Sequence, residues 1–195
     1  MRHAALGGWL PILLVWAAQA RAQPPASPVT AGAERTLRGP WRLSPDEVSE
    51  LETKVAAAPA DLELRGRLLR HYMTDRTPEA RAARARHVLW IIANAPEADI
   101  AGSPVTYADK IIEPEVHEQA RSLWLAHLEA SGSNPKIVGN AAAFFLLSER
   151  ERARDLLQRG RELEPENPQW SERLAHLDML AARRPGAEAR DSARR

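Results

Sequence analysis

Cysteine is absent from the 195 residues of this chain. Disulfide bonds, thiolate metal ligands, a thiol nucleophile and lipidation of an N-terminal cysteine are therefore excluded. The packing of apolar side chains must hold the fold together. Lysine is also scarce, occurring only at Lys54, Lys110 and Lys136, so arginine carries almost all of the positive charge.

Neither sign of charge is in excess. The chain has 27 basic and 26 acidic residues, a net charge of +1 that becomes −1 if Arg2 and Arg21 are removed with a leader. Binding to nucleic acid usually requires basic side chains clustered on one face. We therefore expect no nucleic-acid partner.

The chain also lacks an apolar run of the roughly 20 residues that a membrane-spanning helix needs. The apolar run Leu6–Ala18 follows Arg2 and precedes the small-residue sites Ala18-Gln19-Ala20 and Ala20-Arg21-Ala22. These are the three parts of a secretory signal peptide. We predict that residues 1–22 are a signal peptide cleaved after Ala22, that the protein is exported to the periplasm or cell exterior, and that no membrane span remains. The alternative is an uncleaved anchor.

Residues 23–43 contain several prolines and glycines, and we predict that they form a flexible linker. Trp41 is the aromatic residue of this linker, and we expect it to fold back onto the first helix. Helical spacing of apolar residues then continues to the C-terminal region, and no stretch alternates with the period of a strand. We predict an all-α domain over 44–184, followed by a disordered tail at 185–195. Its seven helices are expected to start at Ser44, Asp61, Thr77, Glu115, Ile137, Glu149 and Pro168.

Residues 96–114 are the least regular stretch of this domain. They contain three prolines, Gly102 and Ser103 among several apolar residues. Loops of this length without periodicity are often functional or packed as a unit of their own. A short helix over 107–112 is the secondary structure that we consider for this segment.

Two features repeat 33 residues apart, Asn134-Pro135 with Asn167-Pro168 and Ala120 with Ala153. A period in the thirties with two helices per unit indicates a helical solenoid. Residues 134–167 resemble a tetratricopeptide repeat (TPR) at the positions that pack its two helices together: Ile137, Ala141, Phe144, Ala153, Leu157, Gly160 and Pro165. The resemblance implies a stack of antiparallel helix pairs in a short right-handed superhelix, with 168–183 as a capping helix.

In tetratricopeptide proteins the first helices of successive units line a concave groove. Transferring that arrangement to this repeat directs Val138, Ala142, Phe145 and Leu146 toward the groove, as candidate partner-binding residues. These side chains could instead pack against residues 96–114. Asn140 is the polar residue of this helix, and its amide either bonds to the adjacent structure or is presented to a bound backbone.

Motifs for catalysis or metal binding are missing. His117-Glu118 begins like a zinc-protease motif, but Arg121 stands where the second histidine is required. The sequence also has no nucleophile elbow, phosphate loop or dinucleotide-binding glycine pattern. We therefore expect no metal and no cofactor.

The combined interpretation is a non-enzymatic adaptor that binds another protein or peptide in the bacterial envelope or periplasm. One alternative is a structural subunit of an envelope assembly, which would expose a large apolar face. A further alternative is a small enzyme that uses Tyr107, Asp109 and Lys110 of the 96–114 segment.

Overall fold

The computed structural model describes residues 41–182, and this part of the chain contains α-helices, 3₁₀ turns and loops without a strand. The prediction of an all-α fold with seven helices is confirmed for these residues. The helices are α2 (Pro45–Ala57), α3 (Leu62–Thr74), α4 (Pro78–Asn94), α5 (Pro114–Ser131), α6 (Pro135–Phe145), α7 (Arg150–Leu163) and α8 (Gln169–Ala182). The expected signal peptide, most of the expected linker and the expected tail lie outside the described residues.

Polar side chains fix where the helices begin. Ser44 and Glu47 form a reciprocal capping box at α2, in which each side chain accepts a hydrogen bond from the other residue's backbone N–H. Asp61, Thr77 and Asn134 accept backbone hydrogen bonds at the starts of α3, α4 and α6. Proline occupies the first turn of four helices, where its missing N–H costs nothing: Pro45, Pro78, Pro114 and Pro135.

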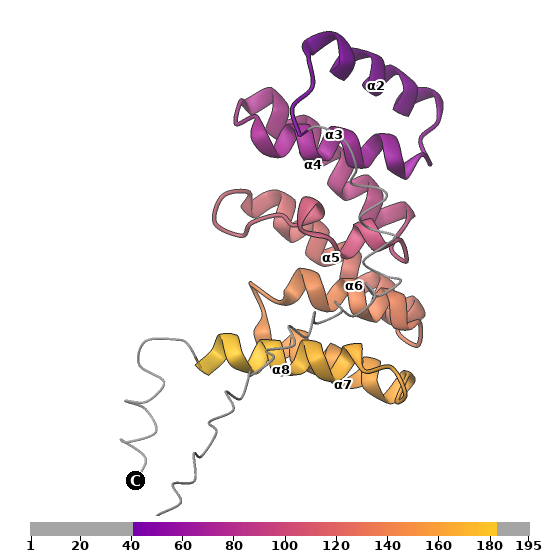
Figure 1. The fold of residues 1–195 in the computed structure, drawn as a ribbon, viewed down its shortest axis with the longest axis vertical. Coiled ribbons are helices and arrows are strands. Elements are labelled where there is room, and N and C mark those ends of the chain that lie inside the picture. Colours follow the sequence, from indigo (N-terminus) through magenta and orange to yellow (C-terminus); the bar gives the residue numbers. More distant parts are fainter. Residues whose placement is uncertain (1–40, 183–195) are drawn as a thin grey trace, which may run out of the picture.

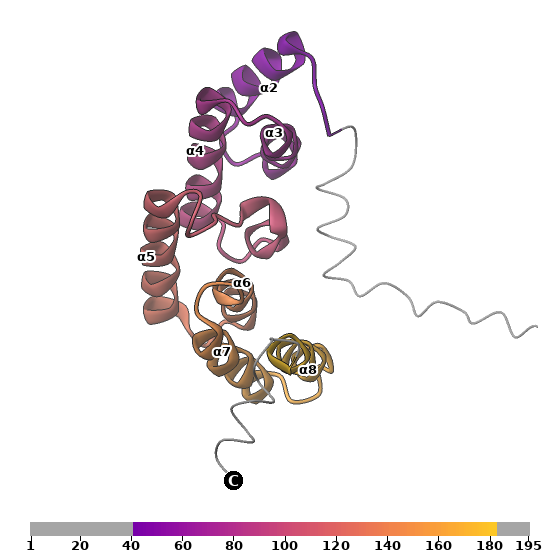
Figure 2. The same ribbon diagram turned by 90° about the vertical axis from the view of Figure 1, so that its left-hand side faces the viewer.

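The helices form two layers of a curved stack. Figure 2 shows α4, α5 and α7 along the outer side of the curve, with α3, α6 and α8 along the inner side and α2 at one end. Successive helices pack against each other from α2 to α8, and α6 with α7 is the most extensive of these pairs. Within the described residues, no helix combines the length and the apolar character that crossing a membrane requires.

Residues 96–114 lie in the inner layer between α3 and α6 (Figure 2). The segment contains two 3₁₀ turns, η1 (Asp99–Gly102) and η2 (Pro104–Thr106), rather than a helix over 107–112. The Thr106 hydroxyl lies 3.1, 2.9 and 2.9 Å from the carbonyl oxygens of Ile100, Ala101 and Ser103 and donates its one proton to one of them at a time, which joins the two turns. A hydroxyl that satisfies local carbonyls favours such a turn over a helix.

A buried arginine of α4 connects residues 96–114 to the outer layer. Arg84 of α4 forms an ion pair with Glu113 at 2.8 Å and donates to the carbonyl oxygens of Val105 and Tyr107 at 3.2 and 2.6 Å. His117 of α5 adds a hydrogen bond from Nδ1 to the Ala108 carbonyl at 2.9 Å. The irregular backbone is therefore fixed by side chains from the two helices behind it.

Two groups of buried side chains make up the core. The larger group runs from α3 to α8 and includes Trp124 and Phe145, both fully buried. The smaller group joins α2 to α3 and the start of α4. Leu43 is part of it, whereas Trp41 is 53% exposed and does not belong to the buried core.

A polar network also joins α2, α3 and α4. His87 Nδ1 accepts a hydrogen bond from Arg65 at 3.0 Å, and His87 Nε2 donates to Glu52 Oε1 at 3.1 Å. The Tyr72 hydroxyl donates to the same carboxylate oxygen at 2.6 Å. Burial lowers the pKa of His87, and the nearby Arg65 charge acts in the same direction. Because a guanidinium group can only donate hydrogen bonds, a proton on His87 Nδ1 would remove the acceptor for Arg65 and break this hydrogen bond.

This network predicts a loss of stability in mild acid. The pKa of His87 lies below its ordinary value of 6.5 in the folded protein, so the unfolded chain binds protons first as the pH falls below that value. We expect chemical denaturation to show a lower free energy of unfolding at pH 5.5 than at pH 7.5. The His87→Gln variant should lose most of this difference and the exposed His176→Gln control should keep it; equal pH dependence in both variants would contradict the assignment.

Candidate functional site

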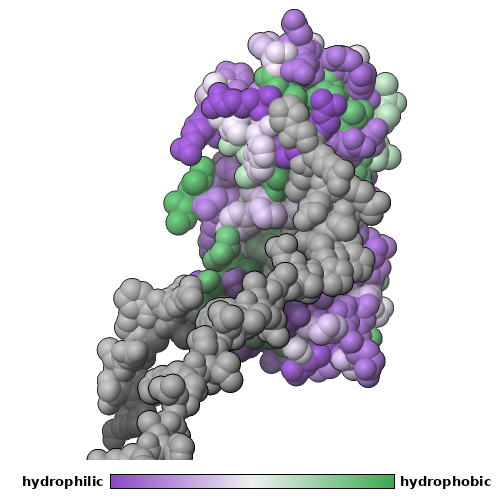
Figure 3. All heavy atoms as spheres, viewed as in Figure 1, coloured by the Kyte–Doolittle hydropathy of each residue, from purple (hydrophilic) through white to green (hydrophobic). Residues whose placement is uncertain are grey.

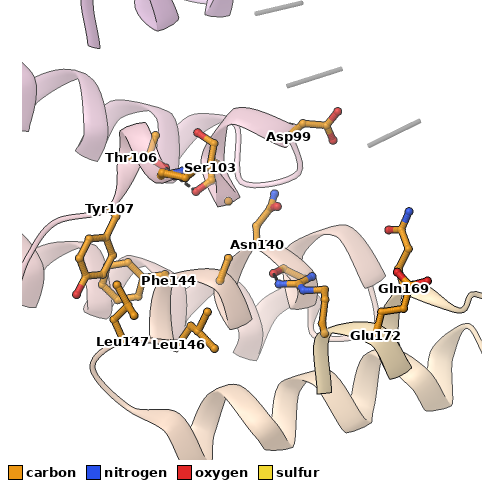
Figure 4. Close-up of a pocket in the computed structure, with 16 residues that line it drawn as sticks. Asp99, Ser103, Thr106, Tyr107, Asn140, Phe144, Leu146, Leu147, Gln169 and Glu172 are labelled. Atoms are coloured by element: carbon orange, nitrogen blue, oxygen red, sulfur yellow. Dashed lines mark hydrogen bonds between the residues drawn. The ribbon is translucent and has the colours of Figure 1, made fainter. Parts of the chain in front are cut away.

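A groove of about 680 Å³ opens on the inner side of the stack, and we call it the concave groove. One wall is the η1–η2 segment, the floor is α6 and the other wall is the first turn of α8 (Figure 4). Its lining includes Asp99, Gly102, Tyr107, Asn140, Ala143, Phe144, Leu146, Leu147, Gln169, Glu172 and Arg173.

Asn140 of α6 fixes the first wall to the floor. Its Nδ2 donates to the carbonyl oxygens of Pro96 and Ala98 at 2.8 and 3.0 Å, so both amide hydrogens are used inside the protein. Gly102 lies directly over this side chain, and a Cβ at Gly102 would be 2.3 Å from Asn140 Oδ1. Of the two roles considered for Asn140, the structure therefore shows the bond to adjacent structure.

The candidate partner-binding residues do not all face the groove. Val138, Ala142 and Phe145 are buried in the large core, together with Ile100 and other residues of the 96–114 segment. The prediction that these three side chains line an open groove is wrong, because the irregular segment covers the helix face that carries them. Leu146 is partly buried and does line the groove, as does Asn140.

Most of the residues assigned to helix packing in the repeat are buried. Ile137, Ala141, Phe144, Ala153, Leu157 and Gly160 are all buried, as expected for side chains between packed helices. Pro165 is exposed and follows the last residue of α7, Leu163, by two positions. A proline there disfavours continuation of the helix.

One end of the concave groove is apolar. Tyr107, Phe144, Leu146 and Leu147 gather there from the η1–η2 segment and the end of α6 (Figure 4). Leu147 has 60% of its surface exposed, although it is a large apolar residue. Phe144 stacks on the His117 ring at a centroid distance of 4.9 Å, which fixes the apolar floor. Burial raises the pKa of Tyr107, so its phenol stays neutral and able to donate a hydrogen bond.

The other end is polar and carries both signs of charge. Asp99 lies on the η1 wall, and Gln169, Glu172 and Arg173 lie on the α8 wall. Arg173 donates from Nη2 to the Gly139 carbonyl at 2.7 Å, and burial lowers the pKa of its guanidinium group. Among the described residues, no carboxylate lies within ion-pair distance of Arg173. The groove therefore offers apolar contacts at one end and hydrogen-bonding groups at the other.

Of the residues considered for catalysis, Asp109 has a structural role. Asp109 Oδ1 accepts hydrogen bonds from the backbone N–H groups of Ile111 and Ile112 at 2.7 and 3.1 Å, which shapes the turn before α5. Lys110 is exposed. Arg121 pairs with Glu149 at 2.7 Å. Over residues 41–182, no group of three or more histidine, aspartate or glutamate side chains is placed to hold a metal ion.

Sequence reasoning missed Ala143, Leu147 and the α8 wall. No sequence signal distinguished Leu147, which lies two residues beyond the end of α6 at Phe145. The α8 wall also had no signal, because its contribution depends on how α8 packs beside α6. Space-filling representation shows apolar surface on the same edge of the molecule as the loops before α5 and after α6 (Figure 3).

Comparisons of the chain with models of known protein families, with curated proteins and with solved structures found no match. The function is therefore argued from the geometry of the groove.

Proposed function

We propose that this protein is a non-enzymatic adaptor that binds a segment of another protein in the concave groove. The observation that carries the proposal is the apolar end of the groove, where Leu147 is 60% exposed beside the partly buried Tyr107 and Leu146. Such side chains gain free energy when a partner removes them from water. The opposite end of the groove offers polar side chains, which suits a peptide with mixed side chains.

The proposal includes two further elements from the sequence. The close packing of α6 with α7 and the burial of the residues that resemble repeat positions support a tetratricopeptide-type unit at 134–167. The charge, apolar run and small residues of 1–22 support export to the periplasm or the cell exterior. In this account the partner is another protein of the envelope, and neither a metal nor a cofactor takes part.

A structural role in an envelope assembly is the second candidate. The observation that favours it is the pair Ile111 and Ile112, which are 90% and 69% exposed at the turn before α5. The turn before α5 and the loop after α6 lie on the same edge of the molecule (Figure 1). A permanent interface would cover both sites together, whereas a peptide ligand needs only the groove.

The Leu147→Glu variant tests the adaptor proposal. We expect it to lose capture of the partner from envelope extract of the source organism, because a carboxylate in the apolar end would be desolvated by a bound segment. Its thermal unfolding should match that of the parent, since Leu147 is mostly exposed.

Two matched variants separate the candidates. Met179→Glu changes another exposed apolar side chain, 52% exposed on α8 and outside the groove lining, and should keep the partner. Ile111→Glu should also keep it if the groove alone binds, whereas loss from both Leu147→Glu and Ile111→Glu favours the structural subunit. Retention of the partner by Leu147→Glu would overturn the groove as the binding site.

A further inference from the structure

The outer layer carries a second groove, between α4 and α5, which we call the outer groove. Its volume is about 910 Å³, and its floor contains Leu89, Trp90 and Leu123, all half-buried. The Arg65 guanidinium carbon lies 3.7 Å from the Trp90 ring centroid, so the indole is held in place from below. Apolar side chains held in an open groove on the outer side are available to another molecule.

The two helices that form this groove run in the same direction. The Arg84–Glu113 ion pair joins the first half of α4 to the residue just before α5. Farther along both helices, His127 Nε2 of α5 lies 2.8 Å from the Ile92 carbonyl oxygen of α4. A residue of α4 that closely follows one of these contacts therefore lies at a similar position along the groove axis as the residues of α5 that closely follow the same contact.

The walls of the outer groove carry opposite charges at the same height. Arg86 lies on the α4 wall, two residues after Arg84, while Glu115 and Glu118 lie on the α5 wall shortly after Glu113. Within residues 41–182, neither Arg86 nor Glu115 forms an ion pair. Glu118 contacts Arg121 at 3.4 Å, but both side chains are largely in water and such a contact contributes little.

This pattern is complementary to itself. A two-fold axis along the groove, parallel to the helices, would place α4 of each copy over α5 of the other at the same height. Arg86 of one copy then faces Glu115 and Glu118 of the other, twice per pair, while the apolar floors meet between them. We propose that the occupant of the outer groove is a second copy of this chain and that the protein forms a symmetric dimer through α4 and α5.

The proposed dimer leaves the concave groove of each copy free, because the two grooves lie on different layers of the stack (Figure 2). One dimer would present two concave grooves facing away from each other. Two linked grooves bind a repeated or dimeric partner more tightly than one groove does. The dimer does not depend on the adaptor proposal, because its test needs no partner.

Sedimentation equilibrium of the chain, expressed from Met1 and purified as the host processes it, tests the proposal. We expect the average mass to rise from one chain toward two as the protein concentration increases. Arg86→Glu and the double variant Glu115→Arg/Glu118→Arg should each stay at one chain, because each places like charges across both contacts. An equimolar mixture of the two variants should recover the mass of two chains, since opposite charges then meet at both contacts.

Arg161→Glu is the matched control, because Arg161 is exposed on α7 outside the outer groove and its reversal should leave the dimer intact. Circular dichroism of each variant must match the parent. A parent mass of one chain at all concentrations up to about 1 mM would overturn the proposal. So would a dimer that both reversals leave unchanged, because the contact would then lie elsewhere, or variants that stay monomeric when mixed.

Discussion

Arg84→Ala is expected to lower the free energy of unfolding by about 3–5 kcal/mol, the usual cost of removing one member of a buried ion pair. The side chains of Arg84 and Glu113 are only 9% and 13% exposed, so the remaining carboxylate would be left without a partner. The carbonyl groups of Val105 and Tyr107 would also lose their donor. Urea denaturation followed by circular dichroism measures the change.

The effect should be concentrated in the segment that Arg84 holds. Hydrogen exchange of the amides in 99–113 is expected to accelerate more than exchange in α7, because the segment has little regular structure of its own. Arg81→Ala is the control, since Arg81 is exposed on the same helix and bonds only to the nearby Arg76 carbonyl. Equal stability of the two variants would show that Arg84 does not hold the inner segment to α4.

Gly160→Leu is expected to destabilise the protein by about 3 kcal/mol through overpacking. A Cβ at Gly160 would lie 2.4 Å from ring atoms of Trp170, far inside contact distance. The indole cannot easily move away, because it is buried and its Nε1 donates to Glu164 at 3.0 Å. The side chain would therefore force α7 and α8 apart, and thermal unfolding should occur at a lower temperature.

Gln158→Leu provides the comparison for this variant. Gln158 is exposed on the same helix, so the added leucine meets water rather than Trp170. Its unfolding temperature should stay near that of the parent. If Gly160→Leu and Gln158→Leu unfolded at the same temperature, α7 and α8 would not approach each other as closely as the structure shows.

Local sequence signals were sufficient to predict the helices. Capping residues such as Ser44 and Asp61, followed by apolar residues at helical spacing, specify a helix start through atoms only three residues apart. Small residues at repeat positions likewise indicated close helix packing. Gly160 was expected to let the two helices of its own unit approach, and the structure adds that its nearest neighbour is Trp170 of the following helix.

The groove was harder to predict because distant segments build it. Nothing within α6 shows that Val138, Ala142 and Phe145 are covered, since the covering residues are those of 96–114. The shape of that segment depends in turn on Arg84, more than ten residues before it in sequence. The groove face transferred from the repeat was wrong for these three residues because the 96–114 segment packs against α6 and shares a buried core with them.

Site-specific photo-crosslinking is the most direct test of whether a partner protein binds in the concave groove. A photoreactive side chain replaces Leu147 in one variant and Met179 in another, and both are irradiated in cells of the source organism. We predict one crosslinked protein from position 147 and little or none from position 179, because only position 147 lines the groove. Absence of a crosslink from position 147, or the same products from both positions, would contradict the account.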